Sequence, residues 1–173
     1  MRWQDLSDSG AFGQVCHDRL VAPGVLLVVT TRRDGTARLS PIEPLVLEGE
    51  LWLCMMWKSA KAADVERDNR VLIHSAVAGP IDPGEVKLRG LAIEELDPGR
   101  RLRYRDAVQV LGWQPEEPTF HLFRIDIDDV TLIRYRPNGD QLVARWPART
   151  EVIRRETSAT SVGPLEPHPE FFA

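Results

Sequence analysis

The chain has 173 residues, a formal net charge of −4 and a hydrophobic content of 43%. A single domain of this size buries roughly 70% of the surface that its unfolded chain exposes, so it needs no disulfide framework. The acidic balance argues against a nucleic-acid-binding domain, because binding a phosphate backbone requires a dominant basic face.

The cysteines and the N-terminal segment bear on the compartment. Cys16 falls in an expected helix and Cys54 in an expected strand, and we interpret both as small core residues in a reducing setting. The chain begins without an apolar run that precedes a small-residue cleavage site, and no apolar stretch reaches the roughly 18 residues of a membrane span. We therefore expect a soluble, cytoplasmic protein with no membrane partner.

The first part of the chain has the pattern of a helix followed by a meander. Apolar residues at helical spacing predict an amphipathic helix over Ser9–Val21. A continuous apolar run predicts a buried strand over Val25–Thr31, and the Asp-Gly pair that follows predicts a hairpin. The return strand, Thr36–Leu47, contains Pro41 and Pro44, which lack ladder donors and therefore predict an edge, a bulge or a bend.

The next segment is the one around which we expect the molecule to be organised. Leu51–Met56 predicts a third strand, and Ser59–Arg67 predicts a short helix that Ser59 caps. The Ser59 hydroxyl, the free N–H groups of the first turn and the ammonium groups of Lys58 and Lys61 would meet at the positive end of the helix dipole, which favours a phosphate. The alternative is that Ser59 merely caps a surface helix and that both lysines are solvated.

The middle of the chain predicts two more strands and a helix. Val71–Val77 and Glu85–Leu96 have strand patterns, and Ala78–Gly84 between them has the composition of a loop. Asp97 is followed by a proline, a pair that predicts a helix start, and Gly112 suits the far end of that helix.

The last strands form a hairpin in this interpretation. Phe120–Tyr135 alternates between apolar and polar residues and then shifts phase, which predicts a bulge near Asp128 and Asp129. The Asn-Gly pair that begins at Asn138 predicts a tight turn, and Gln141–Trp146 predicts its return strand.

These elements predict one domain of about seven antiparallel strands and three helices, over residues 1–156. A mainly β fold, a small closed or partly open barrel with short flanking helices, is favoured over a doubly wound parallel sheet because the connections are tight turns. The segment Thr157–Ala173 is rich in Ser, Thr and Pro, so we expect a tail that is ordered only against a partner surface.

The order of the elements, with the residues inside them, resembles the FMN-binding split-barrel superfamily, that is, the pyridoxamine 5'-phosphate oxidase-like proteins and their flavin- and deazaflavin-dependent relatives. The resemblance covers about Ala11–Tyr135. It implies an antiparallel split β-barrel of Greek-key type, and a homodimer in which each FMN, or each deazaflavin coenzyme F-420, lies in a groove between the subunits. It is carried, after an opening helix, by Gly24–Thr31, Gly35–Pro41, Leu51–Met55, Ser59–Val71 and Val86–Gly90.

The resemblance also implies a binding site. In this family a Ser-x-Lys at the helix start holds the cofactor phosphate, which here implies Ser59 and Lys61. The two residues that end the preceding strand, here Cys54 and Met55, line the cofactor through backbone and side chain, and Arg38 matches a basic residue that reaches the phosphate. Together with the local chemistry described above, the candidate cofactor-binding residues are Arg38, Ser40, Cys54, Met55, Lys58, Ser59 and Lys61.

Three departures separate the chain from true pyridoxamine phosphate oxidases. Glu43 stands five positions after Arg38, where those enzymes have a second basic residue, and Ala60 stands where they often carry arginine. The C-terminal Arg and His cluster that holds the substrate's own phosphate is not found. The resemblance therefore implies a flavin site without vitamin B6 oxidation.

The function implied is a flavin- or deazaflavin-dependent oxidoreductase that transfers hydride to a small conjugated or aromatic substrate. The cofactor performs such chemistry, so the sequence predicts binding residues and names no catalytic one. One alternative is a non-catalytic flavin- or haem-binding or redox-sensing protein, since the Glu43 carboxylate would oppose a phosphate. Another is a purely structural dimerisation domain.

The histidines and tryptophans are further candidates for chemistry. The four histidines are too scattered to show metal-ligand spacing, so no metal site is expected. Trp57 and Trp113 fall near loops, where their rings could stack on a cofactor or cover a substrate.

Overall fold

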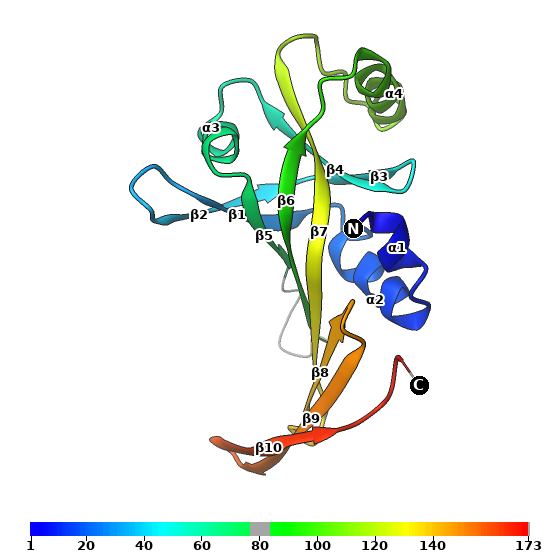
Figure 1. Ribbon diagram of the computed structural model, residues 1–173, viewed down its shortest axis with the longest axis vertical. Coiled ribbons are helices and arrows are strands. Elements are labelled where there is room, and N and C mark those ends of the chain that lie inside the picture. The colour runs from blue at the N-terminus through cyan, green and yellow to red at the C-terminus, as the bar shows by residue number, and fades with distance from the viewer. Residues whose placement is uncertain (77–83, 173) are drawn as a thin grey trace.

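The computed structural model of the chain describes residues 1–76 and 84–172 (Figure 1). Within them, ten strands form one antiparallel sheet and four helices accompany it. The helices are α1 (Trp3–Ser7), α2 (Ala11–Leu20), α3 (Ala60–Arg67) and α4 (Pro98–Gln109). The strands are β1 (Leu26–Thr31), β2 (Ala37–Ile42), β3 (Pro44–Leu47), β4 (Glu50–Met56), β5 (Arg70–Ser75), β6 (Glu85–Glu94), β7 (Phe120–Tyr135), β8 (Gln141–Trp146), β9 (Thr150–Ser158) and β10 (Ser161–Pro167).

The sheet is a split barrel that stays open in the part of the chain that the structure describes. Its hydrogen-bonded order is β10-β9-β8-β7-β6-β5-β1-β2, and a branch from β7 carries β4 and then β3. The consecutive strands β2 and β3 pair with different neighbours, β1 and β4, so the sheet is open between them. The predicted fold class, a mainly antiparallel split β-barrel with short flanking helices, is confirmed.

The predicted return strand Thr36–Leu47 is divided in two. Strand β2 ends at Ile42 and β3 begins at Pro44, which leaves Glu43 between them. The two prolines in this stretch cannot donate to a ladder, so the chain changes partner strand here and does more than bend. The predicted edge is confirmed, because β2 and β3 both lie at edges of the sheet, but the stretch is two strands and not one return strand, with Glu43 between them.

Two apolar clusters hold the molecule together. The larger one fills the barrel, and Trp3 of α1 and Phe12 of α2 belong to it. The sequence did not predict α1, because its five residues are too short to show a period. The smaller cluster fixes α4 beside β4 and β7, and its buried members are Trp52, Tyr104, Val108, Phe120 and Leu122.

Local signals placed several other elements correctly. The Asp97 carboxylate accepts the backbone N–H of Arg100 at 2.8 Å and so caps α4 as predicted. The tight turn at Asn138 and its return strand β8 are also present. The predicted strand Val71–Val77 is found as β5, whose last residue is Ser75. Val77 and nearly all of the predicted loop Ala78–Gly84 lie outside the described residues.

The predicted bulge in β7 is confirmed. The register with β6 changes between the pairs Arg89–Asp129 and Gly90–Ile127, so Asp128 is the extra residue. At this point the two backbones come close together. A Cβ atom at Gly90 would lie 2.3 Å from the Asp126 carbonyl oxygen.

The C-terminal segment is more regular than its composition suggested. Ser161–Pro167 forms β10, which pairs with β9, and the expected domain boundary after residue 156 falls inside β9. Figure 1 shows β8, β9 and β10 at the end of the molecule remote from α4. The rings of Phe171 and Phe172 then pack against Phe12 of α2. Composition missed this strand because a backbone ladder holds it and few of its side chains are buried. Packing of this segment on a partner subunit remains a prediction.

The close approach at the bulge gives a test of the fold. Gly90→Ala should lower the free energy of unfolding by about 1–3 kcal/mol, because the new methyl group would push the backbones of β6 and β7 apart. The matched control is Gly163→Ala in β10, where the new methyl carbon would lie 3.6 Å from its nearest neighbour, and its effect should stay within about 0.5 kcal/mol. Urea unfolding measures both. Equal effects of the two substitutions would contradict the described register.

Candidate functional site

A groove of about 880 Å³ lies where the β2–β3 junction, the end of β4, the first turn of α3 and the helix α4 meet. Its walls are mostly apolar, and Trp113 and Leu111 after α4 contribute to them. Two of its lining residues are charged, Glu43 and Lys61. The remaining lining residues are Gly24, Val25, Pro41, Ile42, Pro44, Leu45, Cys54, Met56, Tyr104, Val108 and Gly112.

Cys54 and Tyr104 give the groove an uncharged polar surface. Cys54 is half-buried on β4, Tyr104 is buried on α4, and the thiol and the phenol hydrogen-bond with each other. Burial raises the pKa of the Cys54 thiol to about 12, although the Tyr104 hydroxyl and the charge of Arg101 act in the opposite direction. Burial likewise raises the pKa of the Tyr104 phenol above its usual value. Both groups are therefore neutral at physiological pH.

The phosphate-site prediction can be compared with the start of α3. Ser59 caps this helix, and its Oγ accepts the backbone N–H of Ala62 at 3.4 Å. Lys61 lies in the first turn and lines the groove. Among the described residues, neither Lys61 nor Glu43 takes part in an ion pair. The groove thus presents one cation and one anion that remain available to a ligand.

Lys58 differs from Lys61 in its surroundings. It is exposed and precedes the cap, and its φ of 55° lies in the left-handed region. This conformation costs a non-glycine residue roughly 1–2 kcal/mol, so other contacts must hold the turn.

Arg38 is bound to a carboxylate in this structure. Its Nε donates to Asp64 Oδ2 at 2.6 Å, and the Thr30 hydroxyl donates to the same oxygen at 3.0 Å. Burial disfavours ionisation of Asp64, but the hydrogen bonds from Arg38, Thr30 and Arg67 outweigh it and hold the pKa of this carboxyl below its usual value. The charge of Arg38 is therefore compensated inside the chain, and its contact with a phosphate remains a prediction.

The other predicted residues lie in different surroundings. Ser40 is half-buried on β2, on the same face as Arg38, because strand side chains alternate. The Met55 side chain is buried in the core with 1% exposure, whereas the next residue, Met56, is 77% exposed and lines the groove. Met55 can therefore reach the groove only through its backbone.

Sequence reasoning missed the contribution of α4 to the groove. Tyr104 and Val108 belong to the apolar face of that helix, but their position over the end of β4 depends on long-range packing. Trp113, for which the sequence indicated a covering role, does line the groove. The ring of Trp57 instead stacks on His121, with centroids 4.7 Å apart.

His121 forms a polar cluster behind α3. Its Nδ1 lies 2.9 Å from a Glu94 carboxylate oxygen and 3.6 Å from one of Glu66. The prediction of no metal site rested on the spacing of histidines alone and did not foresee this arrangement. The three donor atoms lie within 4.8 Å of one another.

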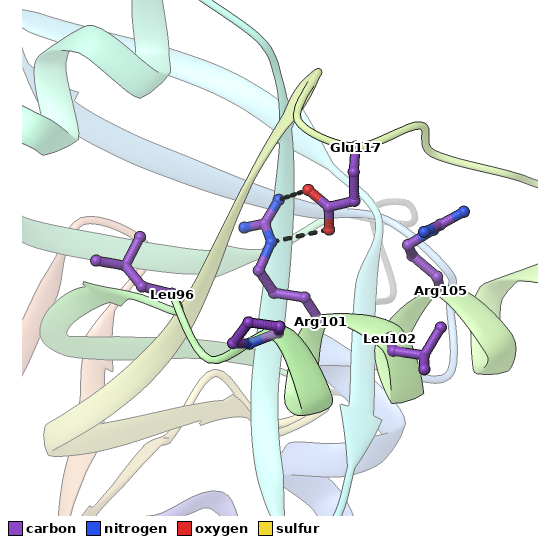
Figure 2. Close-up of a pocket in the computed structure, with 6 residues that line it drawn as sticks. Leu96, Arg101, Leu102, Arg105 and Glu117 are labelled. Atoms are coloured by element: carbon purple, nitrogen blue, oxygen red, sulfur yellow. Dashed lines mark hydrogen bonds and ion pairs between the residues drawn. The ribbon is translucent and has the colours of Figure 1, made fainter.

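A second concavity, of about 460 Å³, lies on the outside of α4. Figure 2 shows that Arg101 points toward Glu117 there, and the two side chains form a bidentate ion pair at 2.8 and 2.9 Å. Arg101 also donates to the carbonyl oxygens of Glu95 and Phe120. Its donors are thus used within the fold, and we regard the groove as the candidate site.

Comparisons with known proteins identify the fold. No protein-family model matches the chain, and no curated protein matches it in sequence. Three similar solved structures are a haem-binding protein from Mycobacterium smegmatis (TM-score 0.53, 21% identity, 65% of this chain and 50% of that chain), a pyridoxamine 5'-phosphate oxidase-like protein from Listeria innocua (TM-score 0.54, 16% identity, 63% and 87%) and an F420 reductase (TM-score 0.51, 18% identity, 66% and 94%). The chain therefore has the split-barrel fold that these proteins share, as its sequence predicted. In the described residues no helix has the length and apolarity that a membrane crossing requires.

The raised pKa of Cys54 predicts slow alkylation in the folded protein. At pH 8 a free thiol with a pKa near 8.5 is roughly one quarter thiolate, whereas a thiol with a pKa near 12 is about one ten-thousandth thiolate. Iodoacetamide should therefore modify native Cys54 at least about a thousandfold more slowly than the same residue in urea. Mass spectrometry reads the modification, and Cys54→Ala assigns the peptide. Equal rates in the native and unfolded chains would contradict the described burial.

Proposed function

We propose that the groove binds FMN or coenzyme F-420, and that the protein is a flavin- or deazaflavin-dependent oxidoreductase. Its reaction would transfer hydride to a small conjugated or aromatic substrate. The observation that carries this proposal is the start of α3: Ser59 caps the helix, and Lys61 in its first turn lines a large and mostly apolar groove.

The residues present fit such a cofactor. A groove of about 880 Å³ lies within the usual range of roughly 300–1,000 Å³ for small-molecule sites. The apolar walls of the groove suit a flat aromatic ring system. The phosphate of the cofactor would lie at Ser59 and Lys61, where the helix dipole is positive. Glu43, on the β2–β3 junction, also lines the groove and would repel that phosphate.

The bound cofactor would supply the hydride chemistry, and the chain would supply the surroundings. Lys61 would neutralise part of the phosphate charge. Leu111 and Trp113 are large apolar side chains that are exposed on the groove wall, and they would cover the bound ring and shield it from water. Cys54 and Tyr104 would place neutral polar groups beside the ring.

The fold comparisons support this class of function. Among proteins that share the fold, one is named an F420 reductase and one is pyridoxamine 5'-phosphate oxidase-like. The deciding experiment is a fluorescence titration of the purified protein with FMN and with F-420. A colourless protein that binds neither would remove the proposal.

A second candidate function is cofactor binding without turnover. It is favoured by Glu43 in the groove and by the ion pair of Arg38 with Asp64, which leave few cations for a phosphate. A protein of the same fold is named as haem-binding. Stoichiometric binding of FMN, F-420 or haem, with no reduction of a panel of quinones, aldehydes and tetrapyrroles, would favour this candidate.

The exposed apolar residues around the groove predict a homodimer. Met56 and Leu111 are 77% and 73% exposed, and a second copy of the chain would cover them. We expect a two-fold dimer with a total interface above about 2,000 Å² and with the C-terminal segment against the partner. Sedimentation velocity measures the mass. A monomer in dilute solution would contradict both the dimer and an intersubunit site.

The phosphate site gives a test by substitution. Lys61→Ala should weaken FMN or F-420 binding by about 1.5–3 kcal/mol, the range for a hydrogen bond to a charged group, and Ser59→Ala should weaken it less. Both variants should fold. Isothermal titration measures the change. An unchanged dissociation constant for Lys61→Ala, at low and high salt alike, would make Lys61 only a solvated surface residue.

The matched control is Lys58→Gln, which removes the charge and keeps the strained backbone position. Its effect should be a screened, long-range one, so the variant should differ from the parent at low ionic strength and converge with it as salt is added. The reverse result, a dominant Lys58 and a silent Lys61, would place the phosphate outside the first turn of α3.

A further inference from the structure

The turn Trp57–Ser59 joins β4 to α3 and sets the direction of the Ser59 cap; we call it the phosphate turn. We propose that His121 is a positioning residue that holds the phosphate turn, and that Glu94 fixes the orientation of its ring. This inference rests on the proposed function, because it concerns how the same site receives a phosphate.

His121 contacts the phosphate turn in two ways. Its Nε2 accepts the backbone N–H of Lys58 at 3.5 Å, and its ring stacks on Trp57 with an interplanar angle of 16°. The residue comes from the start of β7, where it pairs with Met55 of β4, so the turn folds back over it. With 3% exposure, His121 is a fixed support.

The hydrogen bonds of the two ring nitrogens of His121 determine its tautomer. Since Nε2 accepts a hydrogen bond from Lys58, Nδ1 carries the proton and donates it to Glu94 at 2.9 Å. A carboxylate on the far nitrogen holds the ring in this orientation, as it does where histidine serves as a ligand or base. The Nε2 atom is thereby aimed at the N–H of Lys58.

The phosphate turn needs such a support because its backbone is strained. Lys58 adopts φ 55° without being a glycine, and the next residue is the cap of α3. If Lys58 relaxed, Ser59 Oγ and the first N–H groups of the helix would change direction. The hydrogen bond to His121 therefore acts on the phosphate through the turn and does not touch the ligand.

A metal ion is the competing interpretation of the same cluster. Glu66, Glu94 and His121 offer three donor atoms within 4.8 Å of one another. A metal on Nδ1 would require the proton to sit on Nε2. That proton would then face the N–H of Lys58, a second donor, so the observed contact favours the support over the metal site.

The test compares FMN with riboflavin, which has the same ring and no phosphate. His121→Phe keeps a ring beside Trp57 and removes both hydrogen bonds, so FMN affinity should fall roughly tenfold while riboflavin affinity stays unchanged. His121→Gln can accept from Lys58 and donate to Glu94, and it should recover most of the loss. If the parent protein prefers F-420, the two ligands compared are F-420 and its phosphate-free deazaflavin core.

The matched control is His74→Phe on β5, a half-buried histidine that interacts with Glu85 and does not line the groove. It should leave the FMN-to-riboflavin ratio unchanged. Should His121→Phe fail to fold, Glu94→Ala tests the same support, because it removes the acceptor of Nδ1 and should lower FMN affinity selectively.

The outcomes separate the inference from the proposed function. Equal weakening of FMN and riboflavin, or no change in either, would overturn the positioning role while leaving the flavin site intact. Stoichiometric Zn²⁺ binding by the parent that His121→Phe abolishes would replace the support with a metal site. A parent that binds no flavin or deazaflavin would overturn the proposed function, and the inference with it.

Discussion

The bulged strand β7 is the constraint on which the other elements depend. Its 16 residues pair with β6 along most of their length, with β4 in the first part and with β8 in the last. One extra residue, Asp128, changes which face of the strand is buried and increases the local twist. The first part then pairs with β4 and the last part with β8, and Figure 1 shows α4 and the β8–β10 extension at opposite ends of the molecule.

The pairing of β7 with β4 also connects the core to the candidate site. It sets His121 opposite Met55, two residues before the phosphate turn begins. The same strand places Phe120 and Leu122 under α4, so the helix that carries Tyr104 is fixed against the strand that carries Cys54. The geometry of the groove is thus determined by packed strands and not by loops alone.

The sequence predicted the features that depend on local interactions and missed those that depend on long-range contacts. The Ser59 and Asp97 caps, the turn at Asn138 and the bulge in β7 depend on neighbouring residues, and their patterns revealed them. The ion pair of Arg38 with Asp64 and the contact of Lys58 with His121 join residues far apart in the chain. The pattern of neighbouring residues in a sequence does not reveal contacts between residues that are far apart in the chain. The Ser-x-Lys start of the helix was therefore predictable, while the compensation of Arg38 was not.

The long-range contacts also decide how much negative charge the site can accept. A phosphate monoester carries roughly −1.5 to −2 charges at pH 7, and the start of a helix contributes about half a positive charge. Lys61 adds one charge at the groove, while Asp64 already compensates Arg38. That supply exceeds the single negative charge of a diester and meets only the lower end of a monoester's charge, before the opposing Glu43 carboxylate in the groove is counted. A fully ionised monoester would need a further cation, from Lys58 beside the helix start, from a second subunit, or from Arg38 if it left Asp64, which the hydrogen bonds from Thr30 and Arg67 to Asp64 oppose. For the cofactor proposed above, the charge that the site supplies therefore bears on the choice between FMN and F-420.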